Sequence, residues 1–169
     1  MDMFLIVLVL LVPIPLYMAY YFLFVKKSND KGVLEVETAF KRVIKRNKLT
    51  ISEMNKFADR LIAIDRKTGR LILIVYRNGI TWEKCINVEE IMRCKINNIV
   101  DHSTGYIKEV NMELRLQNVE DHIRFTFFDD AVDNLSDLGR RIKQSKYWQK
   151  KIEYYVGVPV TNYRLDHIF

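Results

Sequence analysis

The pattern of apolar and polar positions divides the chain into four parts. Met3–Val25 is apolar and carries no charge. Helical periodicity follows over Val33–Asn47, and from Arg60 the period changes to two until a second helical pattern begins after Asp130. We therefore expect residues 1–27 to form an anchor, 28–57 a linker with an amphipathic helix, 58–155 a domain of antiparallel strands, and 156–169 a tail.

The apolar run is long enough for a transmembrane helix, since a helix rises about 1.5 Å per residue and the hydrocarbon core is about 30 Å thick. Pro13 and Pro15 should kink it, which membrane helices tolerate. Basic residues crowd its C-terminal side, beginning with Lys26 and Lys27, so the positive-inside rule places residues 26–169 in the cytoplasm. The acidic start argues against a cleaved secretory signal. We expect a single-pass protein of the inner or plasma membrane, contacting the lipid bilayer through Met3–Val25, with its N-terminus outside.

The first helical pattern is amphipathic and basic. Its apolar positions, which share one face, are Val33, Val36, Phe40, Val43 and Ile44. Two interpretations stay open, because this face could dock on the domain or lie in the lipid headgroup region. The next stretch, Lys48–Asp59, has apolar residues three apart and suits a short helix or a turn.

Strand signals begin with two apolar segments, Leu61–Asp65 and Arg70–Arg77, joined by a turn that contains Gly69. Asn78-Gly79 is a strong hairpin signal, because a type I′ turn needs positive φ at both central residues. Ile80–Val88 is the expected returning strand.

Three half-buried strands are expected next, because apolar and polar residues alternate there. The apolar members are Met92, Cys94 and Ile96, then Val110, Met112, Leu114 and Leu116, then Ile123, Phe125 and Phe127. A long helix is expected over Ala131–Tyr155, with Asp129 or Asp130 as its N-terminal cap. Its predicted core positions are Leu135, Leu138, Ile142, Trp148 and Ile152.

The segments LIAIDRKTGRLILI, INVEEIMRCKI, MELRLQ and HIRFTFFD, followed by the helix DNLSDLGRRIKQSKYW, stand in an order that resembles the pleckstrin-homology-like (PH-like) superfold of small bacterial domains. The resemblance implies an α+β domain, a bent antiparallel sheet or barrel of about six strands closed by a C-terminal helix. It also implies binding in place of catalysis, to membrane lipids in some members and to protein segments in others. Another antiparallel sheet with a helix on one face is the alternative fold.

The net charge of +6 is concentrated just after the apolar run. Basic residues of the amphipathic helix and of the first hairpin turn are candidate contacts to anionic lipid. They are Lys41, Arg42, Lys45, Arg46, Arg66, Lys67 and Arg70. A solvated basic turn is the simpler interpretation of the last three. No nucleic-acid module is recognisable, so no nucleic-acid partner is expected.

Catalytic chemistry has little support. Cys85 and Cys94 lack metal-site spacing, and consecutive residues such as Asp101-His102-Ser103 rarely converge into a triad. No phosphate-binding loop or nucleophile elbow is present in the sequence. We expect no catalytic, cofactor or metal site. The predicted function is a protein-binding or scaffolding module near the bilayer, with an unknown protein partner; the alternative is a peripheral reader of anionic lipids.

Overall fold

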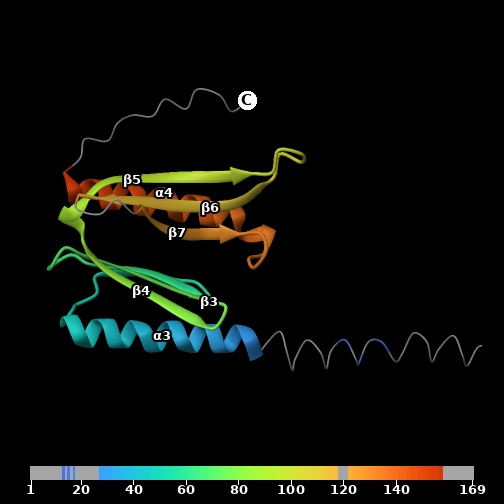
Figure 1. Cartoon of the computed structure of the whole chain (residues 1–169), viewed down its shortest axis with the longest axis horizontal. Coiled ribbons are helices and arrows are strands. Elements are labelled where there is room, and N and C mark those ends of the chain that lie inside the picture. Colours follow the sequence, from blue (N-terminus) through green and yellow to red (C-terminus); the bar gives the residue numbers. More distant parts are fainter. Residues whose placement is uncertain (1–12, 14, 16, 18–26, 118–121, 158–169) are drawn as a thin grey trace, which may run out of the picture. The chain divides into compact units, whose positions relative to one another are not determined.

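The computed structural model describes residues 13, 15, 17, 27–117 and 122–157 of the 169. The chain divides into two compact units, one with residues 1–65 and 72–85, the other with residues 66–71 and 86–169. The fold is α+β, with a four-stranded and a three-stranded antiparallel sheet and a C-terminal helix (Figure 1).

The membrane prediction is corrected by the structure. Among the described residues, no helix is both long enough and apolar enough to cross a bilayer. The longer α-helix described, α3, runs over Lys27–Asn47, and charged residues recur along it. Charged side chains inside a bilayer are costly, which is why this helix does not qualify. Apart from Pro13, Pro15 and Tyr17, the proposed span Met3–Val25 lies outside the described residues. The single-pass assignment and its inner- or plasma-membrane localisation are therefore wrong on this finding.

The first unit is built on a sheet with the strand order β1-β2-β3-β4. The strands are β1 (Glu53–Lys56), β2 (Arg60–Asp65), β3 (Arg70–Arg77) and β4 (Ile80–Asn87). Strands β2 to β4 match the predicted segments within one residue. Strand β1 does not, because a short helix or turn was expected there. Its sequence, EMNK, has no strong strand signal, and it becomes a strand by pairing antiparallel with β2 from Glu53↔Ile64 to Lys56↔Leu61.

Helix α3 begins at Lys27, so the segment expected to be a linker is helical. Its apolar stripe packs on the sheet, which answers the question left open by the sequence. Val36, Ala39 and Val43 are fully buried, and they form one core cluster with residues of β2 and β3. Those partners are Leu61, Ala63, Ile72 and Ile74. The small side chain of Ala39, which the sequence pattern did not single out, lies in the middle of this buried face.

The predicted hairpin turn is confirmed. Asn78 and Gly79 have φ angles of 54° and 81°, and they join β3 to β4. Positive φ at both positions is the type I′ requirement, which asparagine and glycine meet at low cost.

The second unit contains β5 (Ile91–Val100), β6 (Ile107–Leu116) and β7 (His122–Asp129) in that order across a sheet. Helix α4 (Leu138–Val156) packs against all three strands. Two short 3-10 helices, η2 (Val88–Glu90) and η3 (Leu135–Asp137), precede β5 and α4. The large side chains buried in this unit include Phe125, Phe127, Phe128 and Trp148.

The predicted alternation of buried and exposed residues fails at three positions, and each lies beside a register shift. Met92 was expected in the core but is 51% exposed, because a shift between Ile91 and Arg93 reverses the order of inward and outward side chains. The alternation places Asn111 of β6 and Phe128 of β7 on the polar face, but both are buried, beside a shift between Val110 and Asn111.

Helix α4 begins later than predicted, and the acidic pair Asp129 and Asp130 does not cap it. Asp129 ends β7, and its carboxylate accepts a hydrogen bond from the backbone N–H of Ala131 at 3.1 Å. Leu135, a predicted core position, is 62% exposed in η3. The buried face of α4 consists of Arg141, Ser145, Trp148 and Ile152.

The sheets contain seven strands where about six were expected, and the described residues form no closed barrel. The coarse prediction of an α+β antiparallel fold that ends in a helix is confirmed. The barrel is not.

Candidate functional site

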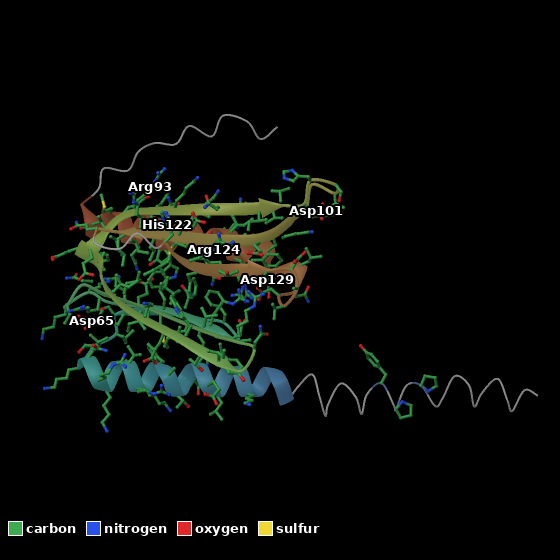
Figure 2. The ribbon with its side chains drawn as sticks, viewed as in Figure 1. Asp65, Arg93, Asp101, His122, Arg124 and Asp129 are labelled. Atoms are coloured by element: carbon green, nitrogen blue, oxygen red, sulfur yellow. The ribbon has the colours of Figure 1, made fainter. Side chains whose placement is uncertain are left out.

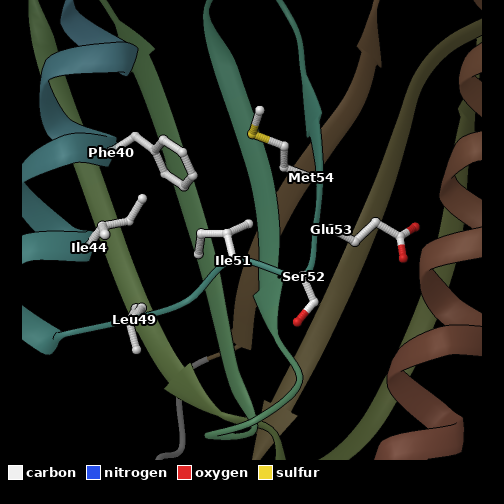
Figure 3. A pocket seen from close by; sticks show the side chains of 7 residues that line it. All are labelled: Phe40, Ile44, Leu49, Ile51, Ser52, Glu53 and Met54. Atoms are coloured by element: carbon white, nitrogen blue, oxygen red, sulfur yellow. The ribbon is translucent and has the colours of Figure 1, made fainter.

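An apolar groove lies between α3 and the edge strand β1 in the first unit. It has a volume of about 500 Å³. Its lining comes from α3, from the connection after it and from β1: Phe40, Ile44, Leu49, Ile51, Ser52, Glu53 and Met54. In Figure 3, Phe40 and Ile44 project from α3 toward Ile51 and Met54, while the Glu53 carboxylate points to the opposite side of β1.

The groove exists because α3 stops abruptly. Lys48 adopts a left-handed conformation with φ of 52°, and the backbone N–H of Leu49 donates to the Ile44 carbonyl at 3.1 Å. This ending turns the chain back across the end of the sheet. Leu49 is thereby buried, and Ile51 is partly buried against the core cluster.

Two hydrogen bonds fix the connection to β2. The backbone N–H of Thr50 donates to Oδ2 of Asp65 at 2.9 Å, and the backbone N–H of Ser52 donates to the Ile64 carbonyl at 2.9 Å. Asp65 is only 1% exposed, so its carboxylate holds the connection from inside the fold. Figure 2 labels this residue at the end of its strand.

Along the exposed side of β1, an ion pair ties strand to helix. Lys56 Nζ donates to Oε1 of Glu37, and this contact, followed by the charge of Lys41, lowers the pKa of the Glu37 carboxyl. Lys41 is four residues from Glu37, so the two side chains are neighbours on α3. This margin of the groove therefore carries the Glu37–Lys56 pair and, next to it, the basic side chain of Lys41.

The basic residues predicted to contact lipid do not form one cluster on α3. Arg42 and Arg46 lie in a separate row that faces β4, where both pair with Glu83, at 3.8 and 3.1 Å. All four of these predicted lipid contacts on α3 are exposed, and Lys41 is close enough to Glu37, on the groove side, to lower the pKa of its carboxyl. The remaining three candidates are the basic residues of the β2–β3 turn, exposed at Arg66, Lys67 and Arg70, and they belong to the second unit.

The groove was missed by the sequence reasoning. Its apolar residues come from the end of a helix, an irregular connection and a strand of four residues, and no single periodicity spans all three. The one available signal in the sequence was that Phe40 and Ile44 lie at the edge of the apolar stripe of the helix. In the structure both are partly exposed.

The loop with triad residue types has a structural role. Oδ1 of Asp101 accepts hydrogen bonds from the backbone N–H of Ser103 at 2.8 Å and from its hydroxyl, and Oδ2 pairs with Lys108 Nζ at 2.7 Å. The hydrogen bond from Lys108, then those from Ser103, lower the pKa of the Asp101 carboxyl. In the part of the chain that the structure describes, no group of His, Cys, Asp or Glu side chains is arranged to hold a metal ion.

No protein-family model, no curated protein and no solved structure matches this chain.

Proposed function

We propose that this chain is a protein-binding module and that the groove between α3 and β1 is its binding surface. The observation that carries the proposal is an apolar groove open beside an exposed sheet edge. Met54, at its mouth, is 52% exposed. Burying one large aliphatic side chain there would contribute about 1.5–3 kcal/mol.

The lining favours a protein segment over a small polar substrate. Small-molecule sites of this size combine apolar walls with a few converging polar groups. Here the polar members are Ser52 and Glu53, and the Glu53 carboxylate points away. The order of antiparallel strands followed by a C-terminal helix, the feature shared with PH-like domains, also supports a binding role, and the PH-like assignment is part of this proposal.

The alternative, a reader of anionic lipid, has less support. The apolar stripe of α3 is buried against its own sheet, so it is not available to a headgroup layer. Arg42 and Arg46 are partly neutralised by Glu83.

Site-specific photo-crosslinking in cells tests the proposal. Benzoylphenylalanine is introduced into the full chain at Met54 in the groove, or at Ile80, an exposed apolar position on β4 of the same unit. We expect a discrete protein adduct at Met54 alone, lost when Ile44→Glu places a charge in the groove.

An Ile44→Leu variant is the matched control, because it keeps the groove apolar, and it should retain the adduct. Equal adducts at Met54 and Ile80, or adducts unaffected by Ile44→Glu, would contradict the proposal. Lipid adducts at Met54 in place of protein would favour the alternative.

A further inference from the structure

The orientation of the peptide groups in β1 bears on how a partner would bind. Phe57 N–H donates to the Arg60 carbonyl at 2.8 Å, which makes these two residues the hydrogen-bonded pair that closes the β1–β2 turn. Hydrogen-bonded and non-hydrogen-bonded pairs alternate along an antiparallel ladder. Counting back from that pair, Lys56↔Leu61 and Met54↔Ala63 are non-hydrogen-bonded pairs. The backbone N–H and C=O groups of Met54 and Lys56 therefore point away from β2.

That outer edge is open in the described part of the chain. Strand β1 stands at the end of the strand order, so no described strand pairs with its outer side. An edge of this kind is a template for another strand. The same two residues aim their side chains at the α3 side of the sheet, because Lys56 pairs with Glu37 on α3 and Met54 lines the groove.

An added strand would lie about 4.8 Å from β1. Its side chain opposite Met54 would enter the groove between Phe40 and Ile44, because directly opposite residues share a face of the sheet. A side chain two residues away on the same face would pass the margin of the groove that carries Lys41. Lys41 is basic, so its complement is acidic.

We propose that the partner is an extended protein segment that adds as a strand to β1, with large aliphatic side chains in the groove and an acidic side chain against Lys41. This inference rests on the proposed protein-binding function and specifies how the partner is bound. Main-chain hydrogen bonds would provide the affinity, and the alternate side chains would provide the specificity.

The probe is a synthetic eight-residue peptide. Its alternate positions read leucine, leucine, glutamate and glutamate, and threonine fills the positions between them. Binding to the full chain is measured by fluorescence anisotropy. We expect saturable binding, and at least a tenfold loss when the glutamates are replaced by lysines or when Ile44→Glu is introduced.

Two N-methylated peptides test strand addition directly. One is methylated on the backbone nitrogens of the alternating leucine and glutamate residues, the other on those of the threonines. Successive peptide groups of a strand point to opposite sides, so only one of the two sets faces β1. We expect that set alone to lose at least tenfold in affinity, and its identity gives the strand direction.

A backbone variant of β1 gives the matching change on the protein side. Met54→Pro removes an outward N–H and leaves the β1–β2 hydrogen bonds in place, whereas Met54→Leu keeps the donor. We expect about a fivefold or greater loss of peptide affinity for the proline variant and little change for the leucine variant, with circular dichroism showing that both remain folded.

Outcomes separate this inference from the proposed function. Equal binding of both methylated peptides, or no binding of the parent peptide, overturns strand addition. The crosslinking at Met54 then decides independently whether the groove is still a protein-binding surface.

Discussion

Asp65 is the residue on which the shape of the groove depends most directly. Its buried carboxylate accepts the Thr50 N–H, and this contact holds the connection that carries Leu49 and Ile51 into the groove wall. We predict that Asp65→Ala destabilises the first unit and weakens binding in the groove, and that Asp65→Asn does so less.

The expected loss of stability follows from the kind of hydrogen bond that Asp65 accepts. A hydrogen bond to a charged group contributes about 1.5–3 kcal/mol net, and a neutral one about 0.5–1.5 kcal/mol. Alanine removes the acceptor completely, so we expect a loss of about 2–3 kcal/mol. Asparagine retains a carbonyl oxygen in the same place but not the charge, so we expect Asp65→Asn to lower the free energy of unfolding by about 1 kcal/mol. With a urea m-value of about 1–2 kcal/mol/M, the alanine variant should unfold at a midpoint about 1–3 M lower.

The assay uses the two tryptophans of the chain, one in each compact unit. Trp82 lies in β4 of the first unit, and Trp148 is buried in α4 of the second. Labelling with 5-fluorotryptophan gives one ¹⁹F resonance for each, so urea titrations report the unfolding of each unit separately. We expect Asp65→Ala to lower the Trp82 midpoint.

Thr50→Ala is the matched control. The donor is the backbone N–H of Thr50 and its side chain is exposed, so this variant should stay within about 0.5 kcal/mol of wild type. This role of the Asp65 carboxylate is refuted if Asp65→Ala and Asp65→Asn both remain that close to wild type, or if Thr50→Ala costs as much as Asp65→Ala.

Three further predictions concern a cysteine, two glycines and a pair of arginines. Burial, followed by the nearby Glu153 charge, raises the pKa of the Cys94 thiol to about 12, so its thiolate is scarce at pH 8 and mass spectrometry should find it alkylated by iodoacetamide far more slowly in the folded chain than in urea. Gly79 has a φ of 81°, so Gly79→Ala should cost about 1–2 kcal/mol by urea unfolding, whereas Gly139→Ala, inside α4, should be neutral or stabilising. Arg93 and Arg115 are directly opposite in the β5–β6 ladder, so a double-mutant cycle with glutamine at each should reveal an unfavourable coupling of about 0.5 kcal/mol or less that fades with added salt.

The elements that were predicted correctly are those whose information is local. Strand β3 is apolar on both faces and rich in β-branched residues, and the Asn78-Gly79 turn demands a backbone that these two residue types supply readily. Neither depends on distant parts of the chain. The sequence therefore contains enough to place them without knowing the fold.

The errors have a common physical origin in tertiary context. Strand β1 has no alternation of its own and exists through its pairing with β2. Met92 is exposed because the pairing of β5 with β6 has one extra residue beside it. Such a register shift cannot be predicted from the periodicity of the sequence. The groove could not be predicted for the same reason, because one of its walls is strand β1, which has no strand signal in the sequence.

The basic amphipathic helix shows how one sequence pattern can hold several functions. Its charges suggested a single cationic surface, yet the structure gives them different surroundings. Arg42 and Arg46 pair with Glu83 of β4, within the fold. Glu37 pairs with Lys56 of β1, and Lys41 acts on Glu37 at the margin of the groove. If strand addition is correct, reversing the charge of Lys41 should impair binding of the acidic peptide, whereas reversing Arg42 and Arg46 should reduce stability and leave the affinity of the folded chain nearly unchanged.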